Sequence, residues 1–204
     1  MARLFDFNNP VWRFMGKIAD MFFLTVLWFV CSIPVITIGA STTALYYVTL
    51  KMVKNHEGYL FKAFFKSFKE NIISSTLLWV IMLAAGVIPA VSFYKISGMD
   101  AQKASFFFWM LAVIAILYLL LITMVFPLAA RLDTGAGQIV FMAFMTTVKN
   151  FGWVLFMTVI TFCVIALGVF VFWPVFLIGA GGTAYAHSVI LENIIFPKYN
   201  WNEK

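Results

Sequence analysis

The chain has 204 residues, of which 64% are hydrophobic and 11% are charged, and its formal net charge is +6 at pH 7. A soluble domain is about 45–50% apolar and about 25% charged, so a water-soluble fold of this length could not bury so much apolar surface. We therefore exclude a soluble enzyme and expect an integral membrane protein, in which the outer faces of the helices are apolar too. In such a protein, Lys and Arg mark the cytoplasmic side and are no sign of nucleic-acid binding.

Four apolar blocks follow one another along the chain. They cover residues 18–50, 72–94, 104–130 and 151–191. A helix needs about 20 residues to cross the bilayer, so each middle block fits one span and each outer block is long enough for two short ones. Pro34 and Pro174 lie near the middle of the outer blocks. We expect these prolines to break each outer block into a hairpin of two helices.

The sequences that follow the two prolines are alike. Residues 34–44 read PVITIGASTTA and residues 174–184 read PVFLIGAGGTA, so seven of eleven positions are identical at a constant offset of 140. We interpret this similarity as an internal repeat, whose two copies would enter the membrane in the same sense.

The positions of the basic residues distinguish between topologies. With six membrane-entering helices, all Lys and Arg residues except Lys95 and Lys103 lie on the side of the termini, a split of 12 to 2; with five spans the split is 9 to 5. Because basic residues concentrate in the cytoplasm, the sequence predicts an all-α bundle of about six membrane-entering helices with cytoplasmic termini, as one transmembrane domain over residues 1–204. Residues 35–50 and 175–190 either cross fully or are re-entrant, since 16 helical residues measure about 24 Å against a hydrocarbon core of about 30 Å.

The repeated stretches carry the first candidate functional residues. Small residues recur four positions apart there, and this spacing lets helix backbones approach closely in a membrane. One interpretation is helix packing, and the other is a pair of broken helices whose ends line a solute pathway. The candidates are Pro34, Gly39, Ala40, Thr43, Pro174, Gly179, Ala180 and Thr183.

Two cytoplasmic segments are further candidates. Residues 58–71 combine phenylalanines at helical spacing with lysines on a neighbouring face, which is typical of a basic amphipathic surface helix that anchors in the membrane interface or docks a partner. Residues 128–149 form a second cytoplasmic connection. Part of it, from Ala129 to Ala136, loosely resembles the coupling loop of ABC importer permeases, although Leu128 stands where that loop usually has Glu. The candidate surface residues are Lys62, Phe65, Lys66, Phe68 and Lys69.

Two ionisable residues lie inside the apolar blocks. Asp20 either serves a structural role near the start of a helix or is a functional intramembrane acid. His187 is either a packed histidine or part of a proton relay. No protease, hydrolase, nucleotide-binding or metal-binding motif occurs in the sequence, so we expect no catalytic residue, no metal and no cofactor.

A family resemblance rests on a few specific motifs. They are Asn9-Pro10, residues 28–34, PVITIGASTTALYY at 34–47 and FFKSFKEN at 64–71. With these motifs the chain resembles the YesL-like family of bacterial membrane proteins, a domain of unknown function that is often encoded beside carbohydrate ABC importers in Gram-positive bacteria.

The resemblance implies a non-catalytic accessory subunit of such an importer in the bacterial cytoplasmic membrane. Its partners would be lipid and either the importer's permease subunits or a second copy of the chain. The residues leave two alternatives open. One is a stand-alone transporter or channel for a small solute, acting as an oligomer. The other is an enzyme of lipid or cell-envelope metabolism with Asp20 and His187 facing each other.

Overall fold

The structure, a computed structural model, describes residues 10–54, 59–96, 101–170 and 173–199, and this part of the chain is built from helices and contains no strand. The all-α class is therefore confirmed. The seven α-helices of the described residues are α1 (Pro10–Ser32), α2 (Ile38–Val53), α3 (Leu60–Ile96), α4 (Ala101–Arg131), α5 (Ala136–Lys149), α6 (Phe151–Phe170) and α7 (Phe176–Ile190). A π-helix (Leu191–Ile195) and a 3₁₀ turn (Phe196–Lys198) follow α7.

The two outer apolar blocks are broken at their prolines, as predicted. The 3₁₀ turn Val35–Thr37 follows Pro34 and separates α1 from α2, and the turn Trp173–Val175 includes Pro174 and precedes α7. Proline has no N–H to continue a helical hydrogen-bond ladder, so the chain changes direction there. The Thr37 hydroxyl donates to the carbonyl of Cys31 over 2.7 Å and so satisfies one of the free carbonyls at the end of α1.

Four helices are long and apolar enough to cross a membrane, which indicates a membrane protein. These segments are Met15–Ser32, Leu60–Lys95, Ser105–Arg131 and Phe151–Phe170. In the most apolar stretch of each segment, only 11% to 39% of the residues are buried against the rest of the chain. Most of their apolar side chains therefore face outward, where lipid can cover them.

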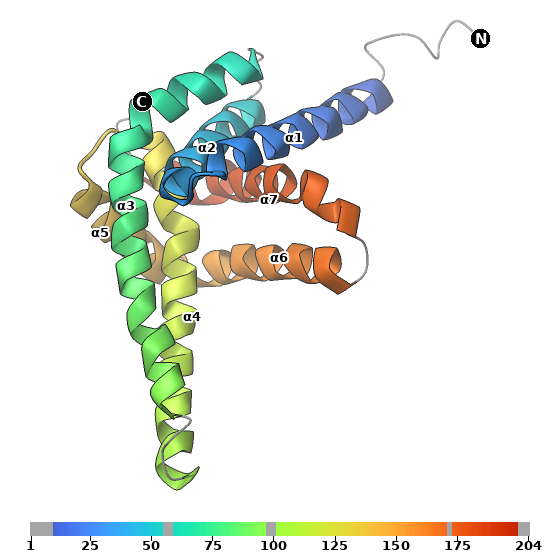
Figure 1. Ribbon diagram of the computed structural model, residues 1–204. Coiled ribbons are helices and arrows are strands. Elements are labelled where there is room, and N and C mark those ends of the chain that lie inside the picture. Colours follow the sequence, from blue (N-terminus) through green and yellow to red (C-terminus); the bar gives the residue numbers. More distant parts are fainter. Residues whose placement is uncertain (1–9, 55–58, 97–100, 171–172, 200–204) are drawn as a thin grey trace, which may run out of the picture.

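The four long helices do not share one direction. α3 and α4 form a long antiparallel hairpin, whereas α6 and α7 run across it (Figure 1). The four candidate spans therefore cannot all lie along one membrane normal, and some must be strongly tilted. The helices α2 and α7, with 16 and 15 residues, are shorter than the four candidate spans.

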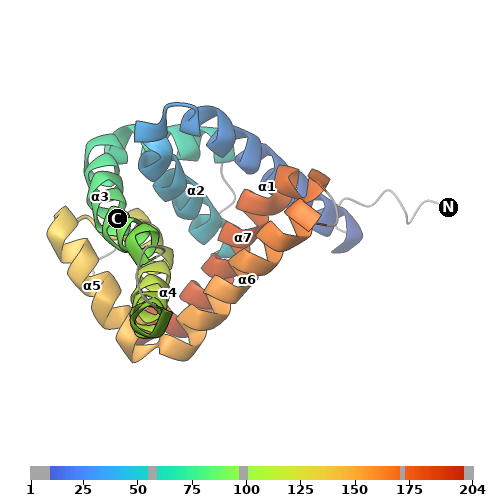
Figure 2. The same ribbon diagram turned by 60° about the horizontal axis from the view of Figure 1, so that its bottom comes forward.

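The core is organised around α2. This helix lies between α3 and α7, as Figure 2 shows, and it also packs against α1 and α4. Small side chains allow this crowding: Ala40, Thr43 and Ala44 are fully buried, and a Cβ atom added at Gly39 would collide with the backbone oxygen of Ser75 on α3. Small residues in the first of the two similar sequences are thus used for close helix packing.

The basic segment predicted at residues 58–71 does not form a helix of its own: from Leu60 onward it is part of a longer helix. It is the beginning of α3, which first runs across one end of the molecule and then turns to run beside α4 (Figure 1). Phe64 is fully buried, and Phe65 and Phe68 pack against the core. Most of the apolar face of this segment is therefore covered by the protein itself, whereas Phe61 is 63% exposed. Residue 58 lies outside the described residues.

Candidate functional site

A cluster of buried polar side chains lies where α2 meets α7. The imidazole of His187 is 1% exposed, and its Nδ1 lies 2.9 Å from the hydroxyl of Tyr46. Its Nε2 lies 2.8 Å from the carbonyl oxygen of Met157 on α6. Because a carbonyl can only accept, Nε2 carries the proton, and in the neutral ring Nδ1 then accepts from Tyr46. The ring thus connects three helices through both of its nitrogen atoms.

The same cluster extends along the two helices. The hydroxyls of Thr49 and Ser188 lie 2.8 Å apart, and both side chains are fully buried. Thr161 on α6 lies 3.3 Å from Nε2 of His187. Buried polar groups cost free energy unless they are paired, so this arrangement fixes the positions of α2, α6 and α7 relative to one another.

A second polar group joins the ends of three elements. Arg131, the last residue of α4, donates to the carboxylate of Glu192 over 2.7 Å, and Lys54 at the end of α2 lies 3.7 Å from the same carboxylate oxygen. The side chains of Arg131 and Glu192 are only 12% and 10% exposed. The guanidinium of Arg131 also lies 4.1 Å from the ring centre of Phe196, in cation–π geometry. Glu192 belongs to the π-helix that follows α7.

The segment after the π-helix is bonded to the start of α6. Asn150, the residue between α5 and α6, donates through Nδ2 to the hydroxyl of Tyr199 over 2.9 Å, and its Oδ1 accepts from Lys198 over 3.0 Å. Residues 191–199 therefore contact the ends of α2 and α4 and the start of α6. These contacts tie the C-terminal part of the described chain to helices that are distant in the sequence.

The predicted repeat residues fall into two groups. Thr43 and Thr183 behave alike, because each hydroxyl donates to the carbonyl four residues earlier, that of Gly39 or Gly179. Their glycines differ: Gly39 lies against α3, whereas a Cβ atom at Gly179 would only touch Val164 at 3.4 Å. Ala40 is fully buried, and Ala180 is partly buried beside the core.

Helix α7 approaches the backbone of α1 most closely at Gly181, a residue that was not among the sequence-based candidates. A Cβ atom there would collide with the carbonyl oxygen of Met21 on α1. The hydroxyl of Thr25 donates to that same carbonyl over 2.8 Å and accepts from the Gly181 amide over 2.9 Å. The signal in the sequence was the adjacent pair Gly181-Gly182, at the positions where the first of the two similar sequences has Ser41 and Thr42.

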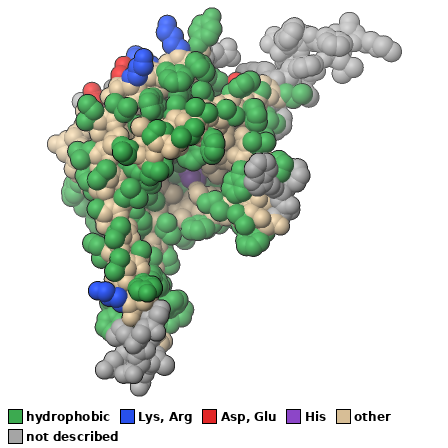
Figure 3. Space-filling model, in the orientation of Figure 1, with side chains coloured by type: hydrophobic (Ala, Val, Ile, Leu, Met, Phe, Trp, Pro, Cys, Tyr) green, Lys and Arg blue, Asp and Glu red, His purple; other side chains and the backbone are tan. Residues whose placement is uncertain are grey.

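The lysines of the basic segment point away from the core. Lys62, Lys66 and Lys69 are exposed, and Lys66 forms an ion pair with Glu70 one turn later at 3.9 Å. With Phe65 and Phe68 turned inward, this segment presents a charged outer face to its surroundings. That face is visible where Lys and acidic side chains gather at one end of the molecule in Figure 3.

Asp20 and His187 are not bonded to each other. Asp20 is partly buried on α1, and the hydrogen-bond partners of His187 are Tyr46, Met157 and Thr161. Lys17, near Asp20 in the sequence, lies 3.2 Å from the hydroxyl of Tyr185 on α7. Among the described residues, no group of three or more His, Cys, Asp and Glu side chains is placed to hold a metal ion.

The comparisons with known proteins point to one family. Residues 21–93 match a family of proteins of unknown function, DUF624. The matched stretch runs from α1 through α2 and most of α3, so it contains the first of the two similar sequences and the basic segment. No curated protein and no solved structure matches the chain.

Sequence reasoning missed most of the polar cluster. It selected His187 but not Tyr46, Thr49 or Ser188, because the bonded partners are 141 and 139 residues apart in the chain. It also missed the pairing of Arg131 with Glu192. The available signal was that each of these two charges lies at the end of an apolar block, where a buried charge needs a partner.

Proposed function

We propose that this chain is a multi-pass protein of the bacterial cytoplasmic membrane that acts as a non-catalytic accessory subunit of a carbohydrate ABC importer. The membrane location is supported by the outward-facing apolar side chains of α1, α3, α4 and α6. The partner class is supported by the resemblance to YesL-like proteins. Permease subunits of such an importer are the expected partners, with a second copy of the chain as the alternative.

For the topology we propose six membrane-entering helices with both termini in the cytoplasm. The ends of the α3–α4 hairpin support this orientation. Near its tip lie Lys95 and three exposed aromatic side chains, Tyr94, Phe106 and Trp109, and Phe93 contacts Phe108 at the same level. Aromatic and basic residues gather at membrane–water interfaces. The tip would then reach the outer interface, and the lysines at the start of α3 would lie on the cytoplasmic side.

The observation that carries the non-catalytic role is the pairing within the buried polar cluster. Both nitrogen atoms of His187 are engaged, and Thr49 and Ser188 bond to each other. A general base or nucleophile must instead face a substrate. The cluster is therefore suited to holding α2, α6 and α7 together, and the function would lie in the outer surfaces of the molecule.

Affinity purification tests the accessory role. The chain would be tagged in its native host, induced with the imported carbohydrate and solubilised in mild detergent, with an unrelated tagged multi-pass protein as the control. We expect permease subunits of a carbohydrate importer to be enriched over that control. A variant with Lys62, Lys66 and Lys69 changed to Gln would show whether the charged face contributes. Recovery of no importer subunit under inducing conditions would contradict the proposal.

A solute pathway is the second candidate, and one observation favours it. Figure 3 shows a hollow in the angle between the α3–α4 hairpin and the α6–α7 pair, with a small part of a histidine side chain that is 1% exposed visible behind it. That side chain belongs to His187, the one histidine among the described residues. Purified protein in liposomes would then take up a small solute, and His187→Ala would change the rate. Equal uptake by protein-containing and empty liposomes across sugars, amino acids and ions would contradict it.

A further inference from the structure

Helix α5 has apolar side chains on both of its faces. Its inner face, with Ile139, Ala143 and Thr146, is buried against the rest of the chain, where α5 packs beside α4 and α3. Its outer face carries Phe141, Phe144 and Val148, which are 61%, 52% and 59% exposed. Lys149 is the one charged residue in the helix. A helix whose exposed face is apolar is typical of a lipid environment and not of water.

The start of α3 lies at the same end of the α3–α4 hairpin as α5, but the residues on its outer face differ. Its outer face carries four charged residues, Lys62, Lys66, Lys69 and Glu70, and one exposed aromatic side chain, Phe61, lies beside them. That pattern is typical of a helix between protein and water. The difference between the two outer faces indicates that α5 and the start of α3 have different surroundings.

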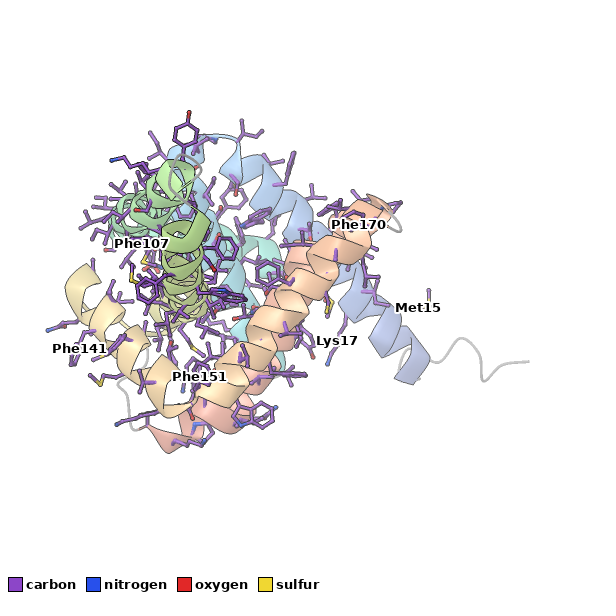
Figure 4. The ribbon with its side chains drawn as sticks, turned by 90° about the horizontal axis from the view of Figure 1, so that it is seen from below. Met15, Lys17, Phe107, Phe141, Phe151 and Phe170 are labelled. Atoms are coloured by element: carbon purple, nitrogen blue, oxygen red, sulfur yellow. The ribbon has the colours of Figure 1, made fainter. Side chains whose placement is uncertain are left out.

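The exposed apolar stripe of α5 continues into a candidate span. A single residue, Asn150, separates α5 from α6, and Phe151, Trp153 and Phe156 at the start of α6 are also exposed. In Figure 4, Phe141 lies at the outer edge of the molecule on α5, and Phe151 lies where α6 begins. The surface that would face lipid on α6 therefore extends onto α5.

The length and the edges of α5 determine how it would lie in a bilayer. Its 14 residues measure about 21 Å, too short to cross a hydrocarbon core of about 30 Å. Gln138 and Lys149 are exposed along one edge of the apolar stripe, since residues eleven positions apart fall on nearly the same side of a helix. One polar edge beside an apolar stripe is the pattern of a helix that lies in the plane of the membrane.

We propose that α5 is an in-plane helix embedded in the interfacial region of the bilayer, with Phe141, Phe144, Met145 and Val148 in contact with phospholipid acyl chains and with Gln138 and Lys149 at the headgroups. This inference rests on the membrane location proposed above. It changes the expectation for residues 128–149, because their helical part would be a membrane-bound element and not a cytoplasmic connection.

Site-directed spin labelling of the reconstituted full chain tests this placement. Single cysteines would replace Phe141, Phe144, Val148 or Gln138 in a Cys31→Ala, Cys163→Ala background, and oxygen and a water-soluble nickel chelate would serve as relaxation agents. Lys66→Cys is the control for water, and Phe162→Cys in the middle of α6 is the control for the membrane interior.

For an in-plane helix, the labels at 141, 144 and 148 should give similar oxygen-to-nickel accessibility ratios, several-fold above that at 66 and below that at 162. The label at 138 should be shallower than these three. Nickel access at 141, 144 and 148 equal to that at 66 would overturn the proposal, and so would low access to both agents, which would place a protein surface or a second copy over α5. If the label at 162 also reports water, the membrane location itself is wrong, so the two failures are distinguishable.

Discussion

At the scale of single residues, Glu192 is the acidic partner of two cations. Its carboxylate lies 2.7 Å from Arg131 and 3.7 Å from Lys54, in a group where Arg131 is only 12% exposed. Removing a negative charge from beside a mostly buried cation is costly. The pairing also holds the π-helix against the ends of α2 and α4.

We therefore expect Glu192→Gln to destabilise the fold. Gln keeps an oxygen that can accept from Arg131 but lacks the negative charge, so we expect a cost of up to about 3 kcal/mol, which corresponds to a decrease of roughly 5 °C in Tm for a chain of this size. Unfolding in detergent would be followed by tryptophan fluorescence. Glu70→Gln is the matched control, because the exposed Lys66–Glu70 pair at 3.9 Å is worth about 0.5 kcal/mol or less. Equal Tm values for the two variants would show that Glu192 has no such role.

Tyr46 provides a second test at this scale. Tyr46→Phe keeps the ring but removes the hydroxyl that donates to Nδ1 of His187, and it leaves that buried nitrogen without its donor. We expect a loss of about 1–3 kcal/mol, measured as a lower Tm. Tyr94→Phe is the control, since Tyr94 is 84% exposed near the tip of the hairpin. An unchanged Tm in Tyr46→Phe would mean that the imidazole does not depend on this bond.

At the scale of helices, α1 and α7 approach most closely at Gly181. Gly181→Ala would push a methyl group against the carbonyl oxygen of Met21, which belongs to the backbone and cannot rotate away. Overpacking of this kind costs about 1–3 kcal/mol, so we expect a lower Tm.

The neighbouring glycine supplies the control for that variant. A Cβ atom at Gly182 would have its nearest contact at 3.8 Å, with Ile178, which is an ordinary van der Waals distance. Because alanine favours a helix over glycine by up to about 1 kcal/mol, Gly182→Ala should leave Tm unchanged or raise it. A larger loss in Gly182→Ala than in Gly181→Ala would contradict the packing described here.

The hydrogen bonds between α2 and α7 join residues that are separated by nearly the same distance along the chain as the two similar sequences. The bonded pairs Tyr46–His187 and Thr49–Ser188 are 141 and 139 residues apart, on either side of the offset of 140 that relates the two similar sequences. Nearly equivalent positions of the two copies therefore meet at the centre of the molecule. This is what an internal repeat with a local two-fold relation between α2 and α7 would produce, and the repeat stays a hypothesis.

At the scale of the whole molecule, the direction of insertion can be measured. Tyr94→Cys and Lys66→Cys, each in the Cys31→Ala, Cys163→Ala background, place one thiol near the hairpin tip and one at the start of α3. With an impermeant maleimide, we expect Tyr94→Cys to react in intact cells and Lys66→Cys to react only after permeabilisation, because basic residues stay in the cytoplasm. The reverse pattern would invert the topology.

Much of the fold could be predicted from the sequence, because it depends on local chemistry. Composition alone indicates a membrane protein, apolar blocks of about 20 residues indicate spanning helices, and Pro34 and Pro174 interrupt the outer apolar blocks because they lack an N–H. The structure confirms the all-helical class and the two breaks. The number of membrane-entering helices was not settled in this way, since it depends on the tilt of helices that cross one another.

The remaining features were decided only by the tertiary structure. Tyr46 and His187 are 141 positions apart, and Arg131 and Glu192 are 61 positions apart, so no local pattern predicts that either pair meets. Likewise, several glycines fit a close packing motif, but only the crossing of α1 and α7 selects Gly181. Sequence determined which segments are helical and apolar, because that depends on each residue's own chemistry. Tertiary structure decided which faces meet protein and which remain for lipid, because burial depends on how distant helices pack.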